Sequence, residues 1–210
     1  MEKAISLQAL QRLPMYLTFL RSLLEQDKQN VSAKQVADAL GLGEIQVRKD
    51  LASVSGGGRP KVGYVTRDLV ADIEAYLGYH DVNDAIIVGA GRLGKALLSY
   101  SGFRDYGLNI VAAFDADPSV LGTDESGKQI LSIEKLEELC KRLKIRIGII
   151  TVPAKFAQEV CNRMVESGIL AIWNFAPTLL KAPAHILVKN ENMATSLAVL
   201  SKHLSENLKK

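Results

Sequence analysis

Three glycines follow an apolar run at residues 85–88 in the spacing Gly-x-Gly-x-x-Gly. Gly89 would permit a tight turn, Gly91 would let the backbone approach a diphosphate, and Gly94 would let a helix pack close to a strand. The diphosphate would rest on the free N–H groups of a helix beginning at Arg92. The spacing therefore predicts a dinucleotide-binding turn. Its members are Gly89, Ala90, Gly91, Arg92, Leu93 and Gly94.

A carboxylate follows the next predicted strand. Residues 109–114 (NIVAAF) are expected to form a strand, and Asp115 comes directly after them. In a dinucleotide-binding unit, an acid at this point accepts hydrogen bonds from the adenosine ribose hydroxyls. Its charge would also repel a 2′-phosphate, so the sequence favours NAD(H) over NADP(H).

The elements that would position these residues alternate between strands and helices. Apolar strands are expected at 85–88, 109–114, 146–152 and 169–175, with helices at 92–100, 132–143 and 154–167. This alternation predicts an α/β fold with a doubly wound parallel sheet, in which ligands bind at the carboxyl ends of the strands. The other residues expected at these ends are Thr151, Val152, Pro153, Asn174, Phe175, Ala176 and Pro177.

Two short helices joined by a glycine turn are predicted nearer the N-terminus. Ser32 and Gln35 form a capping box that opens a helix through Leu40. After the turn at 41–43, a second helix is expected over 44–53. This is the pattern of a helix-turn-helix, whose second helix reads the major groove of DNA. On the second helix we expect Ile45, Val47 and Leu51 to face the core, and Gln46, Arg48 and Lys49 to project outward.

A glycine-rich segment, SGGGRPKVGYV, follows this helix. We expect a basic hairpin, returning as a strand over 62–65, that could lie along DNA as a wing. Between Gln46 and Lys61 four basic residues accompany one acid, Asp50. A solvated surface helix with a loop is the alternative for this segment. The residues expected at DNA are Arg12, Ser32, Lys34, Gln46, Arg48, Lys49, Arg59 and Lys61.

Composition limits the classes of protein. The chain of 210 residues is 48% hydrophobic and 23% charged, with a net charge of +3. It contains no apolar run near the roughly 18 residues that a membrane helix needs, and no secretory signal pattern. Cys140 and Cys161 lack metal-ligand spacing and fall in predicted helices, as reduced packing residues do. We therefore expect a cytoplasmic protein without a metal site or a membrane partner.

Three parts are expected along the chain. Residues 1–80 would form a winged-helix DNA-binding domain, ending after a connector helix at 67–77. Residues 81–190 would form a Rossmann NAD(H)-binding domain. Residues 191–210 would form an amphipathic dimerisation helix, because Met193, Leu197, Leu200 and Leu204 recur at helical spacing. Proteins of the helix-turn-helix class usually read DNA as two-fold dimers, which favours a homodimer.

The order of the motifs resembles that of the redox-sensing transcriptional repressors called Rex. They are Arg12-Leu13-Pro14-x-Tyr16, Gln46-Val47-Arg48-Lys49-Asp50-Leu51, Val62-Gly63-Tyr64, the glycine turn through Tyr100, Phe114-Asp115-x-Asp117-Pro118, and Asn174-Phe175-Ala176-Pro177. The resemblance implies a homodimeric repressor that binds operator DNA, is released by NADH and also binds NAD+. It further implies a domain-swapped C-terminal helix, a switching role for Tyr100, and a nicotinamide site at 151–153 and 174–177.

The sequence departs from the family pattern at several positions. Thr18 and Asn192 stand where relatives commonly have an Arg and an Asp that pair between subunits. The simultaneous loss of both charges avoids leaving one unpaired, and other contacts, with Glu191 as one candidate, would hold the DNA-competent arrangement. The wing is also altered, which affects the expected operator preference.

Two other functions stay open from the sequence. An NAD-dependent oxidoreductase would use the same glycine turn, but no separate substrate domain is expected, and the three histidines are expected at the surface or on helices. A CoA-binding or other nucleotide-binding module is the second alternative. Asp115 argues against CoA, because that ligand carries a 3′-phosphate where the carboxylate would need free hydroxyls.

Overall fold

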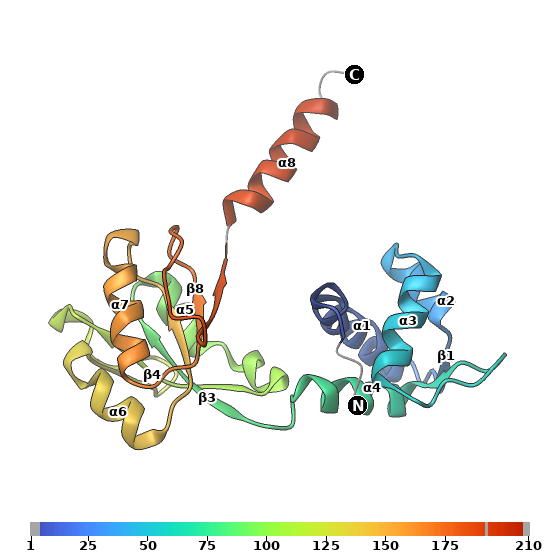
Figure 1. The fold of residues 1–210 in the computed structure, drawn as a ribbon, viewed down its shortest axis with the longest axis horizontal. Coiled ribbons are helices and arrows are strands. Elements are labelled where there is room, and N and C mark those ends of the chain that lie inside the picture. Colours follow the sequence, from blue (N-terminus) through green and yellow to red (C-terminus); the bar gives the residue numbers. More distant parts are fainter. Residues whose placement is uncertain (1–4, 192, 208–210) are drawn as a thin grey trace. The chain divides into compact units, whose positions relative to one another are not determined.

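The computed structural model describes residues 5–191 and 193–207. The chain forms two compact units, Met1–Asp81 and Val82–Lys210 (Figure 1). Each unit has its own buried core, and each is described by itself.

The N-terminal unit packs four helices around an apolar centre. Its elements are α1 (Leu7–Glu25), β1 (Asn30–Val31), α2 (Ala33–Leu40), α3 (Glu44–Val54), β2 (Tyr64–Val65) and α4 (Thr66–Leu77). Helix α1 contributes Leu13, Tyr16, Leu17 and Leu20 to the core, all almost fully buried. Pro14 lies inside this helix without ending it.

The predicted helix-turn-helix is present as α2 and α3. The Ser32 hydroxyl accepts from the Gln35 N–H, and the Gln35 side chain accepts from the Ser32 N–H, so the predicted capping box is confirmed. Gly41 ends α2 in the left-handed conformation at φ +65°, which glycine adopts without a steric penalty. The turn therefore brings α3 back against α2.

Helix α3 corrects two expectations. Ile45, expected in the core, is 70% exposed, whereas Val47 and Leu51 are fully buried as expected. Ile45 precedes Val47 by two positions, which places it about 200° around the helix. Asp50, counted above among the charges of the surface segment, is only 3% exposed. The buried side of α3 thus carries a carboxylate.

The wing is shorter than predicted. The return strand spans only Tyr64–Val65, and its partner is β1 rather than the other arm of the glycine-rich hairpin. The hairpin itself holds one bridge, between Arg59 and Gly63. Gly63 has φ +86°, and a Cβ there would overlap the carbonyl of Val31, so only glycine suits this position.

The C-terminal unit is built on a seven-stranded sheet in the order β5-β6-β4-β3-β7-β8-β9. The strands are β3 (Asn83–Val88), β4 (Leu108–Asp115), β5 (Gly122–Thr123), β6 (Gln129–Ser132), β7 (Ile147–Ile150), β8 (Ala171–Asn174) and β9 (Leu187–Asn190). The β5–β6 pair is antiparallel, and the other neighbouring pairs are parallel. From β6 to β9 this is the doubly wound order, which reverses between β3 and β7.

Helices cover both faces of this sheet (Figure 1). They are α5 (Arg92–Ser99), α6 (Leu136–Leu143) and α7 (Ala154–Glu166), with short 3-10 turns at Ser101–Tyr106, Pro118–Val120 and Ile133–Lys135. Strand β3 shows why both faces are covered: Ile86 and Val88 belong to the cluster formed with α6 and α7, whereas Ala85 and Ile87 belong to the cluster formed with α5. The unit is therefore a Rossmann-like three-layer fold.

Strands β1, β5, β6 and β9 were not predicted. Each has two to four residues, too few for a pattern of buried and exposed positions to be read from the sequence. Cys140 and Cys161 are both buried free thiols on α6 and α7, as expected.

The last element is α8 (Met193–Asn207). Leu197, Val199, Leu200 and Leu204 are each about 60% exposed or more, so the helix keeps an apolar surface within a single chain. Residues 192 and 208–210 lie outside the described part, including Asn192, one of the noted family departures. Among the described residues, no helix is long and apolar enough to cross a membrane.

Candidate functional site

The carboxyl ends of three neighbouring strands place the predicted nucleotide residues side by side. Backbone hydrogen bonds continue one residue past β3, β7 and β8: the Gly89 N–H donates to Phe114 O, Thr151 N–H to Val88 O, and Phe175 N–H to Ile150 O. Gly89 and Thr151 therefore lie at the point where the strand order reverses, and Phe175 follows the next strand of the sheet. This is where doubly wound sheets bind their ligands.

Two of the three glycines are needed to form the turn itself. Gly89 has φ +104°, which residues with a side chain rarely adopt. A Cβ at Gly94 would overlap the Gly89 carbonyl oxygen, which also accepts a 2.7 Å hydrogen bond from the Thr151 hydroxyl. At Gly91, by contrast, a Cβ would meet nothing within 4 Å. Gly91 thus leaves open space at the start of α5, where a ligand could approach the backbone.

Asp115 ties the glycine turn to the end of β4. Its Oδ2 accepts from the Ala90 N–H at 2.6 Å, and its Oδ1 accepts from the Asp117 N–H at 2.9 Å. The backbone thereby holds both oxygens in place at the side of the turn. The remaining lone pairs can accept from vicinal hydroxyls, and the negative charge opposes a phosphate at the same place.

A cavity of about 520 Å³ opens beside this carboxylate. Of the predicted residues it contains Gly89, Gly91, Asp115, Thr151, Val152 and Pro153. Its wall also includes residues that were not predicted to bind the cofactor, namely Val88, Ala116, Asp117, Ile133, Glu134, Phe156, Glu159, Val160 and Arg163. Six of these nine lie on α7 or in the turn before α6, and helix periodicity alone does not show which side of a helix faces a ligand.

Arg163 gives one wall of this cavity a fixed charge pattern. Its guanidinium donates to both carboxylate oxygens of Glu137, at 2.7 and 3.1 Å, and to the Ile133 carbonyl at 3.0 Å. The hydrogen bonds from Arg163 lower the pKa of Glu137 below its usual value. The arginine is therefore neutralised within the protein, and the cavity wall carries the carboxylates of Asp115, Asp117, Glu134 and Glu159.

Nine predicted residues lie outside the cavity wall, namely Ala90, Arg92, Leu93, Gly94, Tyr100, Asn174, Phe175, Ala176 and Pro177. Arg92 and Leu93 are exposed on the first turn of α5, whereas Ala90 is buried. Asn174 is completely buried: its amide donates to the carbonyls of Ala176 and Thr178 and to the side chain of Asn190. The side chain of Asn174 is therefore not free to contact a ligand as expected, and it stabilises the loop after β8 instead.

The structure brings Tyr100 and Phe175 into one aromatic row. Tyr100 stacks edge-on against Phe103 at 4.9 Å between centroids, Phe103 meets Trp173 at 5.8 Å, and Trp173 meets Phe175 at 4.8 Å. Such tilted and edge-on pairs are the favoured aromatic arrangements. The two residues are far apart in sequence, yet one apolar row joins them at the edge of the strand-end region.

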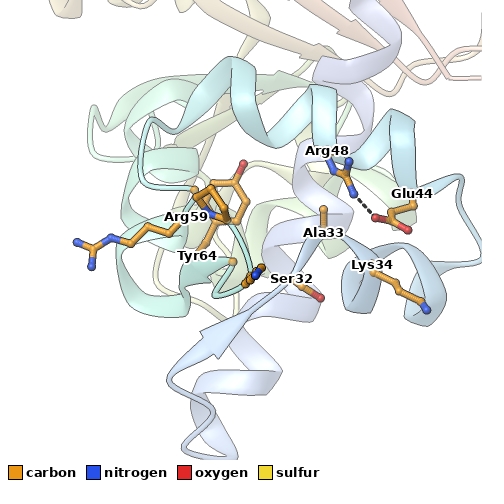
Figure 2. Close-up of a pocket in the computed structure, with 11 residues that line it drawn as sticks. Ser32, Ala33, Lys34, Glu44, Arg48, Arg59 and Tyr64 are labelled. Atoms are coloured by element: carbon orange, nitrogen blue, oxygen red, sulfur yellow. Dashed lines mark hydrogen bonds and ion pairs between the residues drawn. The ribbon is translucent and has the colours of Figure 1, made fainter.

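A second hollow of about 510 Å³ lies between the helix-turn-helix and the wing in the N-terminal unit. Four predicted DNA-contacting cations line it, namely Lys34, Arg48, Arg59 and Lys61, together with Ser32 and a single acid, Glu44. Figure 2 shows Arg48 turned toward Glu44, with which it forms an ion pair, while Arg59 extends away from them. This concave basic surface suits a phosphate backbone.

The three other predicted DNA residues lie beside this hollow rather than in it. Gln46 and Lys49 are exposed on α3. Arg12 on α1 is mostly buried, with 21% of its side chain exposed, and it donates to both oxygens of Asp50, at 2.7 and 3.0 Å. Arg12 therefore serves first as the partner of a buried carboxylate.

Across the part of the chain that the structure describes, no group of three or more His, Cys, Asp or Glu side chains could hold a metal ion.

The fold and sites define a class: a winged helix-turn-helix with a basic surface, followed by a Rossmann-like domain whose glycine turn and aspartate suit a dinucleotide. Family models divide the chain in the same way, since one described as a putative DNA-binding protein N-terminus matches residues 4–52 and one described as a CoA binding domain matches residues 80–178.

Whole-chain relatives narrow the class. A protein of Clostridioides difficile named redox-sensing transcriptional repressor Rex is 39% identical over 97% of both chains. One of the same name from Porphyromonas gingivalis is 40% identical over 91% of this chain and 88% of its own. The crystal structure of RSP in complex with beta-NAD+ and operator DNA matches with a TM-score of 0.91 and 33% identity, covering 98% of this chain and 94% of that one. The chain belongs to the Rex family of redox-sensing transcriptional repressors.

Proposed function

We propose that this protein is a homodimeric transcriptional repressor that binds operator DNA when NADH is scarce and leaves it when NADH binds. The observation that carries the proposal is the presence in one chain of two sites. One is the basic hollow beside α3, and the other is the dinucleotide turn with Asp115 at its side.

The solved relatives support both ligands. One structure of RSP contains beta-NAD+ and operator DNA, and another contains beta-NADH and matches this chain with a TM-score of 0.89. For this chain we assign the cavity beside Asp115 to the adenosine half of NADH or NAD+. The resemblance to relatives that are repressors favours a sensor rather than an enzyme.

The nicotinamide end is assigned to the aromatic row. Tyr100 and Phe175 mark its two ends, and Phe175 follows β8, the neighbour of the strand that Thr151 to Pro153 follow. An apolar surface disfavours a positive charge. The uncharged ring of NADH is therefore preferred there over the cationic ring of NAD+, which gives the site its redox sensitivity.

A dimer is supported by α8. Its leucines at 197, 200 and 204 are exposed in the single chain, and an apolar surface of this kind on a terminal helix suits burial against a second copy. In such a dimer two α3 helices could enter successive major grooves about one turn of DNA apart. Acting on DNA in this way places the protein in the cytoplasm.

NADH would act by shifting the population between two dimer shapes, one matching operator spacing and one not. A coupling of about 1–3 kcal/mol per site is enough for useful regulation, because it changes affinity roughly 5- to 150-fold. No chemical step on the nicotinamide is required.

The test is a titration of labelled operator DNA with the purified protein at one fixed salt concentration, alone and with NADH, NAD+ or both. We expect NADH to weaken DNA binding and NAD+ to compete with NADH without releasing DNA. Salt must be held constant because phosphate contacts make affinity strongly salt-dependent. Unchanged operator affinity at saturating NADH would refute the proposal.

CoA is the second candidate ligand, because residues 80–178 match the CoA binding domain model. Asp115 favours a ribose with free hydroxyls over one with a 3′-phosphate. Calorimetry with NADH and CoA separates the two: we expect heat of binding with NADH and none with CoA at the same concentration.

A further inference from the structure

The amide of Gln46 is held by a buried carboxylate on its own helix. Gln46 Nε2 donates to Asp50 Oδ1 at 2.8 Å, across one turn of α3. Gln46 itself is exposed on α3, as Arg48 and Lys49 are, whereas Asp50 faces the core. One side chain therefore reaches from the surface of the recognition helix into a buried polar network.

The network keeps Asp50 in place and ionised. Arg12 donates to both of its oxygens, and the Tyr16 hydroxyl donates to Oδ2 at 2.7 Å. Burial by itself would raise the pKa of Asp50, but the hydrogen bonds from Arg12, Tyr16 and Gln46 outweigh it and the pKa is lowered. An ionised carboxylate can only accept hydrogen bonds.

This settles which way the amide of Gln46 points. Because Asp50 offers only acceptors, the NH2 group of Gln46 must face it, and one N–H is used there. The amide oxygen and the second N–H then remain together at the outer edge of the side chain. That pair, one acceptor beside one donor, complements the N6 amino group and N7 of adenine in the major groove.

We propose that Asp50, held through both of its oxygens by Arg12, is a positioning residue that sets the amide of Gln46 to read adenine in the operator. The inference rests on the proposed DNA-binding function and adds the identity of one recognised base. Asp50 does not touch DNA, and it acts through Gln46.

Because Asp50 has two oxygens, the effect of the hydrogen-bond network on stability can be tested separately from the recognition of adenine. Gln46 uses Oδ1, whereas Tyr16 uses Oδ2. Tyr16→Phe removes the hydroxyl that donates to Oδ2 and accepts from Arg12 Nε, but it leaves the acceptor for Gln46, so it is the matched control. In Asp50→Asn one amide oxygen remains, and we expect it to take the position of Oδ2, where Arg12 Nε and Tyr16 donate. The new NH2 group then faces Gln46. The Gln46 amide must then turn over, which presents its NH2 group to DNA and disfavours adenine.

The experiment measures the affinity of the full-length protein for a set of operators in which every base pair is varied singly, at one salt concentration. For wild type we expect one position in each half-site where adenine is preferred by roughly 5- to 150-fold, the discrimination of a good bidentate contact. Gln46→Ala should remove the preference at that position alone. Asp50→Asn should remove or change it at the same position, and Tyr16→Phe should retain it despite a lower melting temperature.

Three results would overturn the proposal: a folded Asp50→Asn variant that keeps the adenine preference, Gln46→Ala with every preference intact, or a Tyr16→Phe variant that loses the preference.

If Asp50→Asn does not fold, Asp50→Ala takes its place with the same expectation of a lost preference. The side-chain amide of Gln46 in wild-type protein is followed by NMR in either case. We expect one of its protons to exchange slowly with water, and fast exchange of both would contradict the anchoring. Failure of wild type to bind any operator would instead refute the proposed function.

Discussion

Trp173 Nε1 donates a 2.9 Å hydrogen bond to Glu191 Oε1, and this bond links the end of β8 to the residue that follows β9. The same indole ring packs against Phe175 and Phe103 in the aromatic row. Glu191 was a candidate for replacing a charge that relatives use between subunits. The structure engages one of its oxygens within its own chain, so the last residue before position 192 is tied to the aromatic row.

Loss of this hydrogen bond should change the fluorescence of Trp173, which is the only tryptophan of the chain. We expect Glu191→Ala to destabilise the C-terminal unit by about 1–2 kcal/mol, since a partly buried indole N–H loses a charged acceptor. The emission of Trp173 should change at the same time. Tryptophan fluorescence during urea unfolding measures both. Glu191→Gln is the control, because its amide oxygen can still accept, and an equal loss in both variants would show that the bond is not the cause.

Substitutions at Gly94 and Gly91 should affect different properties: the first should lower stability, and the second should lower the affinity for NADH. In Gly94→Ala the new methyl group would overlap the Gly89 carbonyl, so we expect a loss of about 1–3 kcal/mol of stability and a lower melting temperature. In Gly91→Ala the methyl group enters open space, so stability should stay nearly unchanged while NADH affinity falls, because the backbone can no longer approach the diphosphate. Thermal melting and NADH calorimetry test both variants. Normal NADH binding by Gly91→Ala would contradict the assignment of the diphosphate site.

The carboxylate of Asp115 should determine the preference of the protein for NADH over NADPH. Asp115→Asn removes the charge and turns one acceptor into a donor that faces a backbone N–H, either that of Ala90 or that of Asp117. We expect NADH affinity to fall roughly 10-fold or more, since a hydrogen bond to a charged group is worth about 1.5–3 kcal/mol. The preference for NADH over NADPH should shrink as well.

Calorimetry with both nucleotides measures that preference. Asp124→Asn makes the same change of charge on a turn outside the cavity, where Asp124 accepts from Ser126 and Lys128, and it should leave the preference intact. If NADPH binds wild type as tightly as NADH does, the role given to Asp115 is wrong.

Local signals in the sequence were sufficient for much of the fold. The glycine turn, the strand before it and the capping box each depend on residues within a few positions of one another, and the structure has all three. The doubly wound sheet follows from the alternation of elements. Strands of two to four residues, such as β1 and β9, carry too few positions to show a period.

The parts that could not be predicted depend on pairs that are distant in sequence. Arg12 and Asp50 are 38 positions apart, and nothing local to either residue indicates that one neutralises the other. Asn174 is similar: its type and place suggested a ligand contact, but Asn190, 16 positions later, takes one of its hydrogen bonds on a strand that was not predicted. Polar residues at strand ends can serve the loop or the ligand, and only the tertiary contacts distinguish the two.

Tyr16 should give the N-terminal unit a distinct response to alkaline pH. Burial, together with its hydrogen bond to Asp50, raises the pKa of Tyr16 from 10.0 to about 12. Because the folded state holds this proton more tightly than the unfolded state, the contribution to stability is complete below pH 10 and is lost as the pH rises from 10 to 12. Urea unfolding of wild type should therefore show falling stability over that interval.

Tyr16→Phe should be less stable than wild type at pH 8, but its stability should depend less on pH between pH 10 and 12. Tyr76→Phe, which alters an exposed tyrosine of the same unit, should follow wild type. Parallel curves for wild type and Tyr16→Phe would mean that the buried hydroxyl does not contribute to the alkaline loss.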